Sequence, residues 1–252
     1  MMPMNKKKDT SWGEVADWYH EAVDRKGSYQ SELILPNILR MASIKKGERV
    51  LDVACGEGFF SAEFARSGAV VVGTDISPEL LAIAAKRAPS VKFIKALADD
   101  LSALSDGEFD KAFIILALQN MEYAAEAIGE CSKKMKKGGK MYVVLNHPCF
   151  RIPEHSSWGW DDNVQYRKIE RYLSETKSHI LMRPGSDPDV KTISFHRPLQ
   201  YFFKSFDKAG MAVTRLEEWN SSKMSEPGPR AAAENRARKE IPLFAAFECS
   251  KL

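Results

Sequence analysis

The chain has 252 residues, enough for one large domain or two small ones with a sizeable core. Hydrophobic residues make up 44% and charged residues 28%, as in an ordinary soluble protein, and the formal net charge of +3 argues against a nucleic-acid binder, whose basic excess is larger and clustered. Four scattered cysteines without a CxxC pair argue against a disulfide framework and against a zinc site.

The first part of the chain alternates between helix-like and strand-like segments, the pattern of a parallel sheet covered on both faces. Amphipathic helices are predicted at 12–23 and 31–42. A later helix has a clear start, because Ser77 can cap it and Pro78 suits its first turn. The other predictions, in chain order, are a strand at 49–54, a helix at 59–67, strands at 70–74, 91–96 and 111–118, a helix at 122–135 ended by Gly138-Gly139, and a strand at 140–146.

The texture of the sequence changes after residue 147. Residues 148–195 are rich in proline, aromatic residues and mixed charges, and they predict no regular alternation. Alternation resumes with a helix at 198–209 and a strand at 211–219. Residues 220–240 are polar and predict a loop with some helix, and a last strand is expected at 242–250.

The turn after the first strand, Ala54-Cys55-Gly56-Glu57-Gly58, is typical of a nucleotide site, because small residues let a ligand approach the backbone amides. Asp75 follows the second strand, 23 positions after Asp52, where an acid can accept hydrogen bonds from both ribose hydroxyls. A dinucleotide turn, G-x-G-x-x-G/A, needs a small third residue, and Phe59 occupies that position. A nicotinamide-dependent oxidoreductase is therefore a minor alternative.

Two stretches, VLDVACGEG and GTDIS, resemble the first two motifs of the class I S-adenosylmethionine-dependent methyltransferases, and MKKGGKMYVVL is similar to that family's signature before the fifth strand. The resemblance covers about residues 10–146 and, by topology, the last two strands. It implies one domain over 1–252 with an α/β, Rossmann-like fold: a seven-stranded, mostly parallel sheet, an antiparallel last strand and helices on both faces. N-terminal helices at about 10–42 and the insert 148–195 would cover the substrate. The implied cofactor is S-adenosyl-L-methionine, with S-adenosyl-L-homocysteine as the product.

The resemblance also implies roles for individual residues. Asp52 would organise the turn and lie near the cofactor's amino group, and Asp75 would hold the ribose. The acid that the family often has after the third strand is replaced by Leu97, so adenine recognition would shift to Asp99 or to the amide of Ala98. The remaining implied cofactor contacts are Ala54, Gly56 and Gly58 under the methionine part, Ile76 against the adenine, and Leu116.

Methyl transfer chiefly needs an aligned acceptor and exclusion of water, so a catalytic side chain is optional. His147 is the main candidate for a base, because it leaves the fifth strand at the cofactor edge of the sheet. Arg151 and His196 are candidates to assist it. No set of metal ligands is predicted. Candidate acceptor contacts are Trp12, Tyr19, Gln119, Asn120 and Tyr166.

A small-molecule methyltransferase is the leading hypothesis, and the acceptor and the oligomeric state stay open. An RNA methyltransferase would use the basic residues at 230–239 and 6–8, but the near-neutral charge argues against a nucleic-acid partner. The third hypothesis is a module that binds the cofactor without turnover. We expect a cytoplasmic protein with no membrane partner, because the start is polar and the longest apolar run, 112–118, cannot cross a bilayer.

Overall fold

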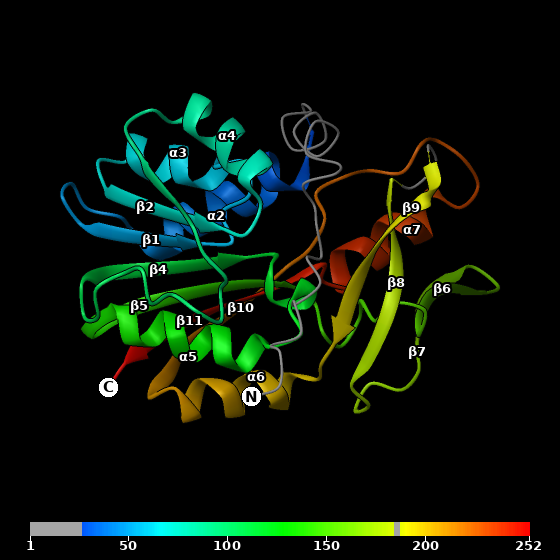
Figure 1. The fold of residues 1–252 in the computed structure, drawn as a ribbon. Helices are drawn as coiled ribbons and strands as arrows, with labels where there is room; N and C mark the ends of the chain where they lie inside the picture. Colours follow the sequence, from blue (N-terminus) through cyan, green and yellow to red (C-terminus); the bar gives the residue numbers. More distant parts are fainter. Residues whose placement is uncertain (1–26, 184–186) are drawn as a thin grey trace.

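A seven-stranded sheet runs through the middle of the molecule in the computed structural model, which describes residues 27–183 and 187–252 (Figure 1). The strand order is β10-β11-β5-β4-β1-β2-β3. The predicted helix at 12–23 lies outside the described residues. The bounds of the strands are β1 Arg49–Val53, β2 Val70–Asp75, β3 Lys92–Lys95, β4 Phe109–Ile115, β5 Met135–Asn146, β10 Met211–Trp219 and β11 Phe244–Lys251.

All strands of this sheet except the last point in one direction. β1 is parallel to β2 and to β4, and the pairs β2–β3 and β4–β5 are parallel as well. β11 lies antiparallel between β5 and β10. The central strands β1 and β4 are buried along nearly their whole length, as their continuous apolar sequences predict. The predicted Rossmann-like sheet with an antiparallel last strand is thus confirmed.

Helices cover both faces of the sheet, and each face has its own apolar core (Figure 1). The start of one helix follows its sequence signal, since the hydroxyl of Ser77 accepts a hydrogen bond from the amide of Leu80 at 3.2 Å. The helices of the first face are α2 Leu35–Ala42, which continues the π-helical turn η2 Gln30–Ile34, α3 Phe59–Arg66 and α4 Pro78–Arg87. Those of the second face are α5 Ala124–Lys134 and α6 Leu199–Lys208.

The insert after β5 folds as two antiparallel hairpins that the sequence does not predict. β6 (Ser156–Asp161) pairs with β7 (Val164–Ile169), and β8 (Thr176–Arg183) pairs with β9 (Asp187–His196). Both hairpins lie beyond one end of the sheet, where the helix α7 (Ala231–Glu240) packs against β7 (Figure 1). The second half of the polar segment 220–240 is therefore helical.

Several element boundaries differ from the sequence prediction, and β5 begins at Met135 instead of residue 140. β4 ends at Ile115 and not at residue 118, because Leu116 has a left-handed φ of 54° that turns the chain into the 3-10 turn η3 (Leu118–Asn120). α5 ends at Lys134, ahead of the predicted glycine stop, and the buried ammonium of this lysine donates a hydrogen bond to the carbonyl of Leu104 at 2.9 Å. Within the described ranges, no helix has the length and apolar character needed to span a membrane.

Candidate functional site

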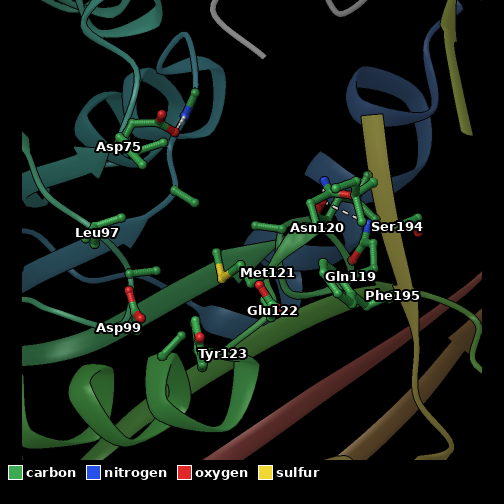
Figure 2. A pocket seen from close by; sticks show the side chains of 18 of the residues that line it. Asp75, Leu97, Asp99, Gln119, Asn120, Met121, Glu122, Tyr123, Ser194 and Phe195 are labelled. Atoms are coloured by element: carbon green, nitrogen blue, oxygen red, sulfur yellow. Dashed lines mark hydrogen bonds between the residues drawn. The ribbon is translucent and has the colours of Figure 1, made fainter. Parts of the chain in front are cut away.

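A cavity of about 820 Å³ lies at the carboxyl ends of β1, β2 and β4, where the strand order of the sheet reverses. Ligands bind at this place in open α/β sheets, and the volume is in the range of small-molecule sites. Its described wall comes from the ends of the central strands, from the segment around η3 and from the β8–β9 hairpin. Figure 2 shows Asp75, Leu97 and Asp99 on one side and Gln119, Ser194 and Phe195 on the other.

The turn after β1 brings backbone to the cavity wall at Ala54 and Gly56. Both residues have a φ of 55°, a left-handed value that glycine adopts freely and that costs alanine about 1–2 kcal/mol. Gly58, with a φ of 74°, is required for another reason: a Cβ atom there would lie 2.9 Å from the Cβ of Ala84. Gly58 thus lets α3 and α4 pack closely, and it does not lie on the described wall.

Asp75 fixes this turn to the end of β2. One of its carboxylate oxygens accepts a hydrogen bond from the amide of Gly56 at 2.9 Å, and the other accepts one from the amide of Ser77 at 2.9 Å. The side chain is buried and lies on the cavity wall. A carboxylate has about four acceptor positions, so Asp75 can bind ligand hydroxyls while it holds the turn.

Two further acids lie behind the wall. Asp52 is 2% exposed and accepts a hydrogen bond from the hydroxyl of Ser61 at 2.6 Å. Burial raises the pKa of Asp52 to about 7, although the Ser61 hydrogen bond acts in the opposite direction. Glu57 lies in the turn itself, 3.2 Å from the guanidinium of Arg87 on α4. This buried ion pair joins the turn to the next helix.

The wall beyond β3 and β4 is made of backbone turns. Leu97 lies there with Ala98 and Asp99, at the position where the resemblance implies an acid. The carbonyl of Leu116 accepts hydrogen bonds from the side-chain amides of Gln119 at 2.8 Å and Asn120 at 3.4 Å. The Oε1 atom of Gln119 is buried and has no hydrogen-bond partner among the residues that the structure describes. An acceptor at this position on a cavity wall can receive a hydrogen bond from an N–H or O–H group of a ligand or from water.

The β8–β9 hairpin supplies the opposite wall. Ile180, Ile193 and Phe195 contribute apolar surface, and Ser194 is buried between the last two. Lys177 pairs with Phe195 in the register of the hairpin, and its ammonium lies 5.5 Å from the centroid of that ring. The sequence predicts none of these contacts, because the irregular composition of the insert hides both strands.

Arg197 is a second feature that sequence reasoning misses, and it ties the hairpin to the segment after η3. Its side chain is 5% exposed and donates hydrogen bonds to the carbonyl oxygens of Met121 at 2.9 Å and Glu122 at 2.7 Å. The guanidinium also lies 5.1 Å from the ring centroid of Phe195 and 5.0 Å from that of Tyr201. Two parts of the cavity wall therefore share one buried cation.

His147 lies at the end of β5, but not on the described cavity wall. Its Nε2 is 2.7 Å from a carboxylate oxygen of Glu218, and its Nδ1 accepts a hydrogen bond from the amide of Cys149 at 3.2 Å. Burial lowers the pKa of His147, against the raising effect of Glu218. Because both ring nitrogens are engaged within the protein, this placement favours a structural role over the predicted role as a base.

Three other predicted acceptor-facing residues lie away from the described wall. His196 is buried, with its Nε2 2.8 Å from the carbonyl oxygen of Tyr172, Arg151 stacks on Trp158 at 5.6 Å, and Tyr166 is exposed on β7. Trp12 and Tyr19 fall outside the described ranges. No group of three potential metal ligands occurs in the part of the chain that the structure describes. The predicted site residues that do line the cavity are Ala54, Gly56, Asp75, Ile76, Ala98, Asp99, Leu116, Gln119 and Asn120.

The sequence of this chain is similar to those of known proteins. Residues 51–143 match a family model described as a methyltransferase domain. A demethylmenaquinone methyltransferase of Renibacterium salmoninarum is 38% identical over 107 residues, which cover 41% of this chain and 44% of the relative. An uncharacterized methyltransferase of Synechocystis sp. is 32% identical over 146 residues, which cover 54% of this chain and 66% of the relative. The chain thus matches between 44% and 66% of the length of these two relatives.

The fold has counterparts among solved structures as well. An S-adenosylmethionine-dependent methyltransferase from Mesorhizobium loti superposes with a TM-score of 0.69 at 24% identity, over 86% of this chain and 96% of that one. At this identity the likeness is one of fold. The segment that matches the family model begins in β1 and ends in β5, so it contains the turn after β1, Asp75 and η3, but neither hairpin.

Proposed function

We propose that this chain, as a member of the class I S-adenosylmethionine-dependent methyltransferase family, transfers a methyl group to a small-molecule acceptor. S-adenosylmethionine is the methyl donor of this family. The observation that carries the proposal is one cavity with two different sides. Asp75 and the turn at Gly56 form a side suited to the cofactor, and the β8–β9 hairpin forms a side suited to an acceptor.

The residues of the first side fit S-adenosylmethionine. Asp75 would accept hydrogen bonds from the ribose hydroxyls, and the backbone at Ala54 and Gly56 would run beneath the methionine part, where a larger side chain would intrude. The buried carboxylate of Asp52 is costly to ionise alone, and the amino group of the cofactor would supply a positive charge near it. The adenine would lie among Ile76, Ala98, Asp99 and Leu116.

When bound, the cofactor supplies an electrophilic methyl group on a positively charged sulfur. The chain's own part is then to hold the acceptor in line and to keep water out. Phe195 and Ile193 on β9 provide an apolar wall for this purpose, held in place by Arg197. We therefore assign the role of substrate cover to the β8–β9 part of the insert.

A small organic acceptor is the class that the cavity and the relatives support together. The volume of about 820 Å³ leaves room for a second molecule of modest size beside a cofactor. The name of the Renibacterium relative refers to demethylmenaquinone, a small organic molecule. Because the match covers 44% of that relative and stops short of its full length, the identity of the acceptor here depends on the cavity's own residues.

Calorimetry tests the cofactor side. Asp75→Ala should weaken S-adenosylmethionine binding by about 1.5–3 kcal/mol, because a carboxylate that accepts two hydroxyl hydrogen bonds is lost. Asp207→Ala removes an exposed carboxylate on α6, away from the described wall, and should leave the affinity unchanged. Equal affinities for the Asp75 variant and the wild type would contradict the ribose assignment. Tighter binding of NAD would contradict the cofactor assignment.

Mass spectrometry tests the transfer itself. The protein is incubated with S-adenosylmethionine that carries a deuterated methyl group and with an extract of small metabolites. The expected result is one metabolite class that gains the labelled methyl group, together with formation of S-adenosylhomocysteine. Cofactor binding without any labelled product would instead support a binding module without turnover.

A further inference from the structure

We propose that the acceptor is a flat molecule with an acidic hydroxyl, bound as its anion against the wall at Phe195 and Ile193, with the ammonium of Lys177 as its counter-cation. This inference rests on the proposed function, because it names the substrate class of the same cavity. It makes Lys177 a residue that determines specificity.

The charges on the described wall are unevenly distributed. The carboxylates of Asp75 and Asp99 lie on the cofactor side, and Glu122 lies between the two sides (Figure 2). Lys177 is the single cationic residue on the described wall, and it belongs to the hairpin that forms the opposite side. The acids match a positively charged cofactor, so the ammonium across the cavity calls for a ligand of the opposite charge.

Lys177 is available for such a ligand. Its side chain is exposed, no described carboxylate forms an ion pair with its ammonium, and the ammonium lies 5.5 Å from the ring centroid of Phe195. Lys168 on β7, in contrast, is 2.7 Å from a carboxylate oxygen of Glu170. An anion that reaches Lys177 therefore displaces no carboxylate of the described residues. A positive charge within about 4–6 Å favours the ionised form of an acid.

The shape and chemistry of the wall around Lys177 favour a flat, largely apolar acceptor. Ile180, Ile193 and Phe195 contribute apolar surface on the same hairpin, and a ring can pack against them. The Oε1 atom of Gln119, which has no hydrogen-bond partner among the described residues, lies on the same side of the cavity as this surface, and Figure 2 shows Gln119 beside Phe195. It would accept a hydrogen bond from a second polar group of the acceptor.

An ionised acceptor also explains why the described wall carries no histidine. His147 and His196 are engaged by Glu218 and by the carbonyl of Tyr172, away from the cavity. An acceptor that has already released its proton to solvent needs no base. Its oxygen lone pair forms the new O–CH₃ bond while the S–CH₃ bond breaks and its electron pair passes to sulfur. The negative charge of the acceptor and the positive charge of the sulfonium disappear together, and no proton is left over.

The probe for this inference is 4-nitrophenol, whose ionised form absorbs visible light. Its apparent pKa is measured by a pH titration in the presence of protein saturated with S-adenosylhomocysteine. The other titratable side chains on the described wall, Asp75, Asp99, Glu122 and Tyr123, would raise that pKa or leave it unchanged, and the guanidinium of Arg197, 5.1 Å from the ring centroid of Phe195, is the same in every variant compared. We expect wild type to lower it by about one unit. Lys177→Met should abolish this shift, and Lys177→Arg should keep it.

Lys191→Met is the matched control, because Lys191 is an exposed lysine of the same hairpin that lies off the described wall. This variant should shift the probe as wild type does. The uncharged analogue nitrobenzene should bind wild type and Lys177→Met equally. An unshifted pKa, no probe binding, or an equal shift in Lys177→Met would overturn the inference. If S-adenosylhomocysteine itself fails to bind, the proposed function falls instead.

Discussion

At the end of β1, the carboxylate of Asp52 is buried beside the hydroxyl of Ser61 and near the carboxylate of Asp75. Burial raises its pKa from an ordinary 3.8 to about 7, against the Ser61 hydrogen bond. At pH values between these two pKa values, Asp52 keeps its proton in the folded chain and loses it in the unfolded chain. The contribution of Asp52 to stability therefore falls as the pH rises from about 4 to 7, and the full cost remains above pH 7.

Asp52→Asn should remove this cost. We expect it to raise the free energy of unfolding of the ligand-free protein by about 1–4 kcal/mol at pH 8, and by little at pH 4, where the carboxyl is protonated in the folded wild type and only partly ionised in the unfolded chain. Binding of S-adenosylmethionine should become weaker. Urea unfolding at the two pH values measures the effect, with Asp207→Asn on α6 as the control. A variant that is less stable than wild type at pH 8 would show that the ionised carboxylate stabilises the fold.

The imidazole of His147 gives a prediction with the opposite pH dependence. Burial lowers its pKa below the ordinary 6.5, so its contribution to stability is present above pH 6.5 and is lost as the pH falls. His147→Gln should lower the free energy of unfolding at pH 7.5 by about 1–3 kcal/mol and reduce the acid dependence. Turnover on an identified acceptor should stay near that of wild type. A loss of about 10²- to 10⁴-fold in turnover, with cofactor affinity intact, would instead establish His147 as a base.

At the scale of elements, the cavity depends on what happens where strands end. Ala54 after β1 and Leu116 after β4 both have left-handed φ values, 55° and 54°, which non-glycine residues adopt at a cost. Such strained positions cluster at functional sites, where the surrounding structure holds them. Here Asp75 anchors the turn after Ala54, and the side chains of η3 bind the carbonyl of Leu116.

Arg197 connects the segment after η3 to the β8–β9 hairpin through its hydrogen bonds. Arg197→Met keeps the bulk of the side chain but leaves the buried carbonyls of Met121 and Glu122 without their donor. We expect the free energy of unfolding to fall by about 1.5–3 kcal/mol, and the probe 4-nitrophenol to bind more weakly. Arg236→Met, at an exposed position on α7, is the control. Unchanged unfolding and probe binding would mean that the hairpin is held by its other contacts alone.

For the whole molecule, the central sheet could be predicted from the sequence because parallel strands buried on both faces are continuous apolar runs. The turn after β1 and Asp75 were also predictable, since small residues and a strand-end acid leave a fixed spacing in the sequence. The hairpins and Arg197 were not. Their strands are half exposed and mixed in charge, and the carbonyl groups that accept hydrogen bonds from Arg197 lie 75 or more residues away in the chain.

The same distinction applies to His147, whose role as a base stays a prediction. Its position at the end of β5 predicts the cofactor edge of the sheet, and the structure places it at that strand end. The direction of its ring depends on the contact with Glu218 of β10. No local sequence pattern reveals that these two residues lie close together. A residue's position along a strand is thus readable from sequence, while the direction of its side chain depends on long-range partners.

Because the cavity joins β1, β2, η3 and the hairpin, its ligand should stabilise the molecule as a whole. S-adenosylhomocysteine at 100 times its dissociation constant should add about 2.7 kcal/mol to the free energy of unfolding, since it binds only the folded chain. For a domain of this size that corresponds to a rise of about 5–10 °C in Tm. The measurement is a thermal melt with and without ligand, with NAD as the comparison. Asp75→Ala should lose most of the rise at the same ligand concentration. An equal rise in Tm with NAD, or the same rise in the Asp75 variant, would contradict the binding of S-adenosylhomocysteine at the turn after β1 and the end of β2.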